Sequence, residues 1–206
     1  MIGLILAELK RHSPFTFFGA LSGIVVAVVF HEITFTAART VFYVLHPVHV
    51  FLSALVTAAM YRINKGYGYS LWLLLAIGYS GSVGIATLSD SVIPFVGEAL
   101  LDMPKRGIHI GFIEKWWLVN PLAIAGVAIA YYMPRTKFPH AGHVLLSTWA
   151  STFHILMAGC REMNVLSFIV ILFFLFVAVW IPCCVSDIVF PLLFVKTDTK
   201  ANSIFK

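Results

Sequence analysis

The sequence predicts an all-α integral membrane protein with about six transmembrane helices, arranged as two inverted three-helix repeats. The first observation is composition: of 206 residues, 60% are hydrophobic and 11% are charged, and the mean hydropathy is +0.94. Soluble domains contain about 45–50% apolar and about 25% charged residues, so a large soluble domain is excluded. The second observation is six long apolar segments without the two-residue alternation of barrel strands. The third is a pair of motifs that each occur twice.

The six apolar segments are each near the length of about 20 residues that a helix needs to cross the hydrocarbon core. In chain order we expect spans at residues 15–38, 47–61, 69 to at least 88, 116–133, 140–158 and 165 to at least 185. Residues 39–46 are also mostly apolar, so the pattern leaves the boundary between the first two spans open. Pro94 and Pro191 follow the third and sixth spans and are expected to break or kink the helices there. Each segment is then either a long helix interrupted just after its aspartate or a helix followed by a short interfacial helix.

The distribution of lysine and arginine predicts that both termini are cytoplasmic. With six spans, nine of the 14 Lys and Arg residues fall on the face that carries the termini, and five fall on the other. Cytoplasmic loops are enriched in these residues. The longest connection, residues 91–115, is then expected outside and holds Glu98, Asp102, His109 and Glu114. We assign the net charge of +5 to loops near lipid headgroups rather than to a nucleic-acid partner, because no Lys/Arg run exceeds two residues.

Two motifs recur in the same order in the second half of the chain. HPVHVFLSAL begins at His46 and HAGHVLLSTW begins at His140, and both carry His, His, Val, Leu and Ser in register. SDSVIP begins at Ser89 and SDIVFP begins at Ser186, and these match at four of six positions. The alternative to a true repeat is chance similarity between apolar helices.

These motifs divide the chain into two units, residues 1–100 and 101–206. Each unit would contain three spans. Because three is odd, the second unit enters the membrane from the opposite side, and a pseudo-two-fold axis in the membrane plane relates the two.

Each unit offers two histidines and an aspartate that suit a metal ion. Residues three apart lie on one face of a helix, so both imidazoles of a pair can bind one ion. An aspartate from a neighbouring helix can supply a third ligand, and zinc, manganese, iron, nickel or cobalt suits such a site. The candidate ligands are His46, His49 and Asp90 in the first unit and His140, His143 and Asp187 in the second. Ser89 and Ser186 are expected to orient the carboxylates.

The two candidate ligand sets are expected on opposite membrane faces, and broken helix ends that fold inward would bring them toward the midplane. Two alternatives stay open. His46 and His140 lie beside prolines and can simply begin helices at the interface. Both pairs also lie in first turns, where the positive end of the helix dipole favours an anionic substrate.

Three further ionisable residues, His31, Glu32 and His154, are expected inside spans. Such residues are costly in a membrane and are functional candidates by default. Because histidine titrates near neutrality, the three are candidates for a proton or substrate pathway. Arg39 is expected to pair with Glu32 or to reach lipid headgroups. Alternatively, His31 and Glu32 lie at the outer interface and His154 is a packing residue.

The cysteines are not expected to be functional. Cys160 stands alone and Cys183 is adjacent to Cys184, so the chain has no CxxC motif. We expect no disulfide framework and treat all three as small buried hydrophobes.

These patterns favour a small membrane transporter or channel for a divalent metal cation. The alternatives are a membrane-embedded metal-dependent hydrolase that acts on a lipid, and an anion carrier. Two like ligand sets favour transport, whereas one cluster that includes His154 favours an enzyme with a metal-activated water. The expected partners are the lipid bilayer, a small ion or small molecule, and further copies of the chain in a homo-oligomer.

Overall fold

The computed structural model describes residues 2–66, 68–134, 137–159, 164–185 and 189–195, with backbone alone for 2–9, 11–12, 137–140 and 184. Every regular element in these ranges is a helix, so the prediction of an all-α protein is confirmed. The elements are α1 (Ile2–Val29), α2 (Phe35–Lys65), α3 (Leu71–Thr87), the π-helix η1 (Leu88–Val92), α4 (Ile93–Leu100), α5 (Gly111–Glu114), α6 (Trp116–Tyr132), α7 (Lys137–Ala158), α8 (Val165–Cys184) and α9 (Phe190–Leu193).

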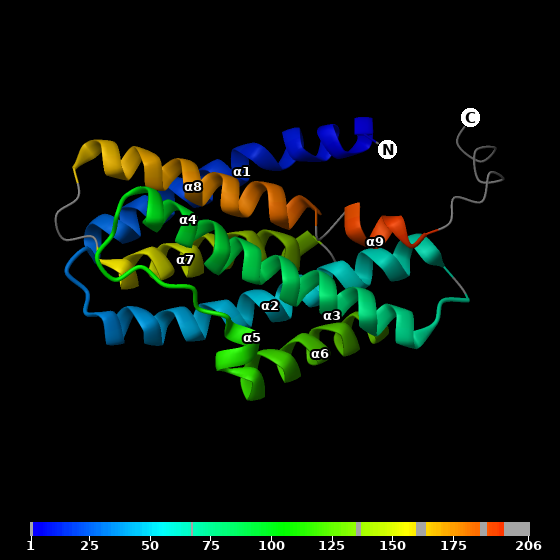
Figure 1. Cartoon of the computed structure of the whole chain (residues 1–206). Coiled ribbons are helices and arrows are strands. Elements are labelled where there is room, and N and C mark those ends of the chain that lie inside the picture. Colours follow the sequence, from blue (N-terminus) through cyan, green and yellow to red (C-terminus); the bar gives the residue numbers. More distant parts are fainter. Residues whose placement is uncertain (1, 67, 135–136, 160–163, 186–188, 196–206) are drawn as a thin grey trace.

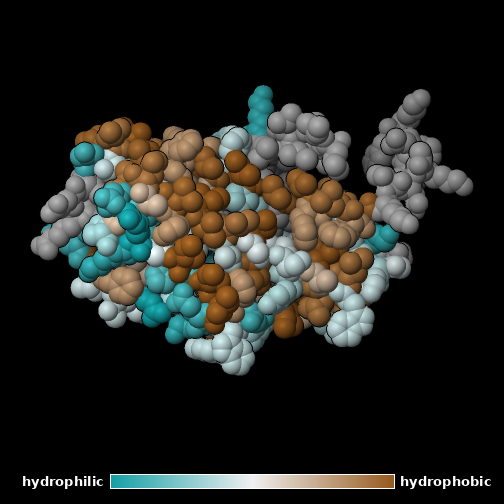
Figure 2. Space-filling model, viewed as in Figure 1, coloured by the Kyte–Doolittle hydropathy of each residue, from teal (hydrophilic) through white to brown (hydrophobic). Residues whose placement is uncertain are grey.

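Three helical stretches are long and apolar enough to cross a membrane: Phe35–Lys65, Leu71–Leu100 and Val165–Cys183. Two shorter apolar helices accompany them, Ser13–Val29 and Trp116–Tyr132. Figure 2 shows a hydrophobic band across one face of the bundle, with hydrophilic residues gathered at the end where α4 finishes. Soluble monomers rarely expose apolar surface on this scale. Length and surface together indicate an integral membrane protein.

Helix α2 lies at the centre of the bundle and packs mainly against α7, α6 and α3 (Figure 1). Glycines allow the close approach. A Cβ at Gly126 would overlap the backbone of Phe51 in α2, and a Cβ at Gly78 of α3 would overlap Val127. Small residues at helix contacts are typical of membrane bundles, where packing rather than water drives association. The core of the bundle therefore surrounds the middle of α2.

The first span expected at residues 15–38 extends too far, and the boundary that the pattern left open lies between Val29 and Phe35. Helix α1 ends at Val29, and α2 begins at Phe35 and runs for 31 residues. The side chain of Thr34 accepts a hydrogen bond from the Ala37 amide, which makes Thr34 the N-cap of α2. Residues 39–46 consequently belong to the second helix. His31 and Glu32 lie in the turn between the helices rather than inside a span.

The third segment is one long helical stretch interrupted near Asp90, which is one of the two predicted arrangements, and the connection expected at residues 91–115 therefore begins only after Leu100. The chain continues from α3 through the π-helical turn η1 into α4, which ends at Leu100. Pro94 occupies the first turn of α4. A proline lacks the N–H that bonds to the preceding turn, and the wider π turn before it accommodates the missing bond. The same turn directs Asp90 into the bundle.

Candidate metal centre

Two histidines of α2 and an aspartate of η1 meet inside the bundle. Nδ1 of His46 lies 2.9 Å from Oδ2 of Asp90, and Nδ1 of His49 lies 2.7 Å from the same oxygen. All three side chains are at most 1% exposed. Their potential ligand atoms lie within 4.8 Å of one another, so the group can hold a metal ion. The spacing of three residues thus places both imidazoles on one face of α2, as the sequence predicted.

Serines hold the second oxygen of the same carboxylate. Oγ of Ser89 and Oγ of Ser147 each donate to Oδ1 of Asp90 at 2.8 Å. Ser151, one turn after Ser147 on α7, donates to the backbone carbonyl of Ser89 at 2.9 Å. Four donors therefore face the two oxygens of Asp90, which suits an ionised carboxylate that only accepts hydrogen bonds. The predicted orienting role of Ser89 fits this geometry, and Ser147 adds to it from the second half of the chain.

The outer nitrogens of both rings lack partners within the described residues. The bonds to Asp90 assign the proton of each neutral imidazole to Nδ1. Nε2 of His46 and Nε2 of His49 are then buried acceptors that receive no hydrogen bond. Leaving a buried polar atom unpaired costs about 1–3 kcal/mol, and native proteins rarely do so. The centre consequently has the capacity to take up an ion or a proton.

The ring of His46 is fixed by close packing on two sides. It stacks on Phe42 with 5.3 Å between centroids and 12° between planes. On its Nε2–Cδ2 edge it meets Gly111, where an added Cβ would overlap the ring. Because that edge is closed, the accessible ligand atom of His46 is Nδ1, which points at Asp90.

A second group of potential ligands shares His49 with the first. The rings of His49 and His143 stack with 5.7 Å between centroids and 5° between planes. Cys183 of α8 completes a group whose ligand atoms also lie within 4.8 Å of one another. All three side chains are at most 2% exposed. This group joins α2, α7 and α8, and the sequence pattern did not indicate its cysteine.

The second predicted ligand set is described only in part. His143 lies beside the first set, as its contact with His49 shows. His140 falls in the first turn of α7, but its side chain lies outside the described residues, as do Ser186 and Asp187.

A buried acid–base pair forms a further polar cluster that sequence reasoning missed. Oε1 of Glu98 in α4 lies 2.6 Å from Nδ1 of His154 in α7, and both side chains are 1% exposed. Nε2 of His154 has no hydrogen-bond partner in the described part of the chain. The expectation that placed Glu98 in an outer loop is therefore wrong. The available signal was a single acidic residue in the apolar run VIPFVGEALL, residues 92–101.

The phenyl ring of Phe42 lies between this pair and the metal centre. Its centroid is 5.3 Å from that of His46 and 5.5 Å from that of His154. His154 therefore does not join the His46–His49–Asp90 group, and the structure has two neighbouring polar clusters rather than one.

A hydrogen-bonded network at the edge of the bundle begins at His109, whose ring lies next to that of His154. The ring of His109 lies 5.4 Å from that of His154, and its Nδ1 lies 3.4 Å from Glu114. Glu114 accepts hydrogen bonds from Tyr43 at 2.5 Å and from Arg39 at 3.1 Å. The predicted pairing of Arg39 with Glu32 is therefore wrong, because Arg39 reaches Glu114 instead.

The environment of this network shifts two pKa values. Burial opposes ionisation of Glu114, but the hydrogen bond from Tyr43 and the nearby His109 outweigh it and hold its pKa below the ordinary value. Burial, followed by repulsion from His154, lowers the pKa of His109. The network is thus suited to a carboxylate beside a neutral imidazole near pH 7.

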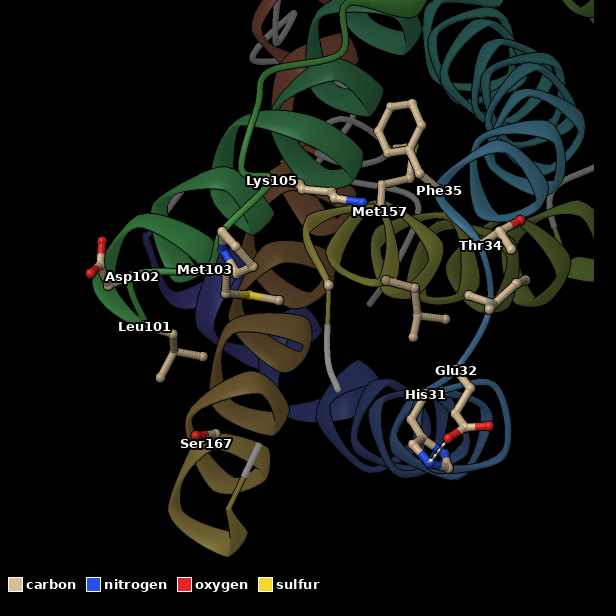
Figure 3. Close-up of a pocket in the computed structure, with 14 residues that line it drawn as sticks. His31, Glu32, Thr34, Phe35, Leu101, Asp102, Met103, Lys105, Met157 and Ser167 are labelled. Carbon is tan, nitrogen blue, oxygen red and sulfur yellow. Dashed lines mark ion pairs between the residues drawn. The ribbon is translucent and has the colours of Figure 1, made fainter. Parts of the chain in front are cut away.

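His31 and Glu32 lie at the surface, away from both buried clusters. Their side chains are 48% and 70% exposed, with 4.0 Å between Nε2 and Oε1. They line one side of an open pocket of about 840 Å³, with Asp102, Lys105 and Ser167 around its other sides (Figure 3). The interface position that the sequence left open for these two residues fits this geometry.

No protein-family model, curated protein or solved structure matches this chain.

Proposed function

We propose that this protein is a membrane carrier for a divalent transition-metal ion. One observation carries the proposal: His46, His49 and Asp90 converge, fully buried, within a bundle of apolar helices. Ionisable residues are rare in membrane helices and usually mark pathways for ions or substrates. The ion is bound by Nδ1 of both histidines and by Oδ2 of Asp90. The proton of each ring moves to Nε2, which is otherwise unpaired.

In this proposal the chain crosses the membrane six times and consists of two inverted units, residues 1–100 and 101–206. The helix contacts support this arrangement. If α1, α2, α3 and α4 correspond in that order to α6, α7, α8 and α9, each contact between two helices has a counterpart between the corresponding helices. Helix α2 packs on α6 as α7 packs on α1, and α3 packs on α6 as α8 packs on α1. Val185 and Val189 have π-helical backbone, as Leu88–Val92 has in the first unit. We keep the proposal that both termini are cytoplasmic.

Burial supports a carrier rather than an open channel. The three ligands are at most 1% exposed, so the conformation described here seals the centre from both sides. A carrier passes through such an occluded state when one repeat rocks against the other. A channel instead needs a continuous path to both surfaces.

Proton counter-transport is part of the proposal and rests on Glu98 and His154. The pair is buried next to the metal centre, with Phe42 between them. His109 and Glu114 connect it toward the outer surface. His31 and Glu32 line an open pocket at the surface, and we keep them as candidates for a proton or substrate pathway.

The alternative functions receive less support from this geometry. A carboxylate at the meeting point of the two histidines repels an anion, which disfavours an anion carrier. A hydrolase needs its metal and water open to a lipid, whereas all the ligands are buried.

The test is metal uptake by proteoliposomes that contain a metal-sensitive dye. We expect uptake of zinc or another of the five candidate ions, and its loss in the His46→Ala/His49→Ala variant. Asp102→Asn is the matched control, because that side chain is 91% exposed and pairs with Arg106. Absence of uptake for all five ions, or cleavage of the lipid detected by mass spectrometry, contradicts the proposal.

A further inference from the structure

The group formed by His49, His143 and Cys183 holds a different ligand chemistry from the first centre. Two imidazoles and a thiol lie within reach of one ion, and none is more than 2% exposed. Thiolate ligands favour borderline and soft ions such as zinc, cadmium and cobalt, whereas oxygen ligands suit manganese and magnesium. A buried cysteine without such neighbours would be only a small hydrophobe.

His49 belongs to both groups, and this limits how they are filled. Its Nδ1 faces Asp90, so Nε2 is the atom left for an ion held with His143 and Cys183. A neutral imidazole can bind one ion while its other nitrogen carries the proton. The two groups are therefore filled alternately, and an ion that passes from one to the other exchanges Nδ1 of His49 for Nε2, while the ring proton moves from Nε2 to Nδ1.

The proposed repeat makes the cysteine an asymmetric feature. The Ser-Asp motifs are 97 residues apart, and this offset places Cys183 opposite Ala86 in the first unit. Ala86 is fully buried and offers no ligand atom. A thiolate is consequently present on one side of the pseudo-two-fold axis and not on the other.

We propose that His49, His143 and Cys183 form a second, thiolate-containing site that receives the ion from the first centre and selects zinc-like ions over manganese and magnesium. The proposal rests on the proposed carrier function and adds its substrate class. On binding, the Cys183 thiol loses its proton and the sulfur bonds to the ion, so each ion bound there releases one proton.

Cobalt absorption tests the site directly in detergent-solubilised full-length protein. Cobalt bound to a thiolate has a charge-transfer band in the near ultraviolet that cobalt bound only to histidine and carboxylate lacks. We expect this band in the natural protein and in Cys160→Ser, and its loss in Cys183→Ser. A band that persists in Cys183→Ser, or that is absent from the natural protein, overturns the second site.

Affinity measurements by competition keep the test decisive if a variant is damaged. Cys183→Ser should lower zinc affinity by more than about tenfold and leave manganese affinity within about twofold, because only the soft ligand is lost. An equal loss for both ions overturns the selectivity. Asp90→Asn separates this inference from the carrier proposal: loss of transport with the cobalt band retained supports both sites, and unchanged transport with the band present supports the second site alone.

Discussion

The imidazole rings of His49 and His143 stack face to face, 5.7 Å apart between centroids, although 94 residues separate them in the sequence. His49 occupies the second position of the first His-x-x-His motif and His143 the second position of the other. The contact brings corresponding residues of the two proposed units together where the middle of α2 meets the second turn of α7, and these helices pack along each other. An axis between these rings would relate the two units.

In the Cys183→Ser background, which lacks the thiolate of the second site, replacing Asp90 by Asn should abolish metal binding at the first centre rather than weaken it moderately. In the proposed centre Oδ2 is a ligand and supplies the negative charge, and an amide replaces neither role well. We expect zinc affinity to fall by more than about 100-fold. A loss of only about 10–100-fold, which is typical of a residue that merely orients a histidine, would indicate binding through Nε2 instead. Isothermal titration with Asp102→Asn as the control distinguishes the two.

Gly111→Ala should disturb the centre through a purely steric contact. The added Cβ overlaps the ring of His46, which Phe42 confines on the other side. We expect the free energy of unfolding to fall by about 1–3 kcal/mol, as for other overpacked sites, and zinc binding to weaken. Gly84→Ala is the matched control, because nothing lies within 4 Å of its Cβ position. Equal behaviour of the two variants would show that the approach of Gly111 to His46 is unimportant.

Glu98→Gln should separate metal binding from proton movement. The variant keeps the size of the side chain and a hydrogen bond to His154 but removes the exchangeable charge. Zinc affinity should stay within about twofold, since Phe42 separates the pair from the ligands. The change in internal pH that accompanies zinc uptake should be lost. A pH-sensitive dye inside the proteoliposomes measures this change. Asp102→Asn at the surface serves as the control, and coupling that survives in Glu98→Gln contradicts the proton role.

Glu114 should stabilise the outer network in a pH-dependent way. Its pKa in the folded protein is below the ordinary value of 4.5, so its ionised form is favoured by folding. The stabilisation is fully present above about pH 4.5 and is lost as the pH falls through the lowered folded-state pKa. Thermal melts of the natural protein and of Glu114→Gln should therefore differ near pH 7 and converge in acid. A difference that grows on acidification has the wrong sign for this account.

The sequence predicted the helical class and part of the centre, because both depend on local pattern. Apolar length indicates spans, and a spacing of three residues places His46 and His49 on one helix face. The pairing of Asp90 with these histidines was expected from the recurrence of the Ser-Asp motif. The sequence does not show which oxygen of Asp90 accepts from the histidines, nor that Ser147 donates to the other oxygen from a distant helix. Both depend on tertiary packing, which a local pattern does not contain.

The errors have identifiable physical causes. The cap at Thr34 competes with a continuous apolar pattern, so the first span was extended nine residues beyond Val29. The break or kink expected near Pro94 is a π-helical turn that carries the chain on to Leu100, whereas Glu98 was misplaced because residues 91–115 were assigned to an outer loop. Cys183 has no motif of its own, and its chemistry follows only from its proximity to His49 and His143.

Anomalous diffraction at the zinc edge, from crystals of the full chain grown with zinc, tests the central claim most directly. The account predicts a peak at metal–ligand distance, about 2.0–2.2 Å, from Nδ1 of His46, Nδ1 of His49 and an oxygen of Asp90, or from His49, His143 and Cys183 in the alternate state. Peaks confined to exposed residues such as His31 and Glu32, with the hydrogen bonds between Asp90 and both histidines intact, would contradict it.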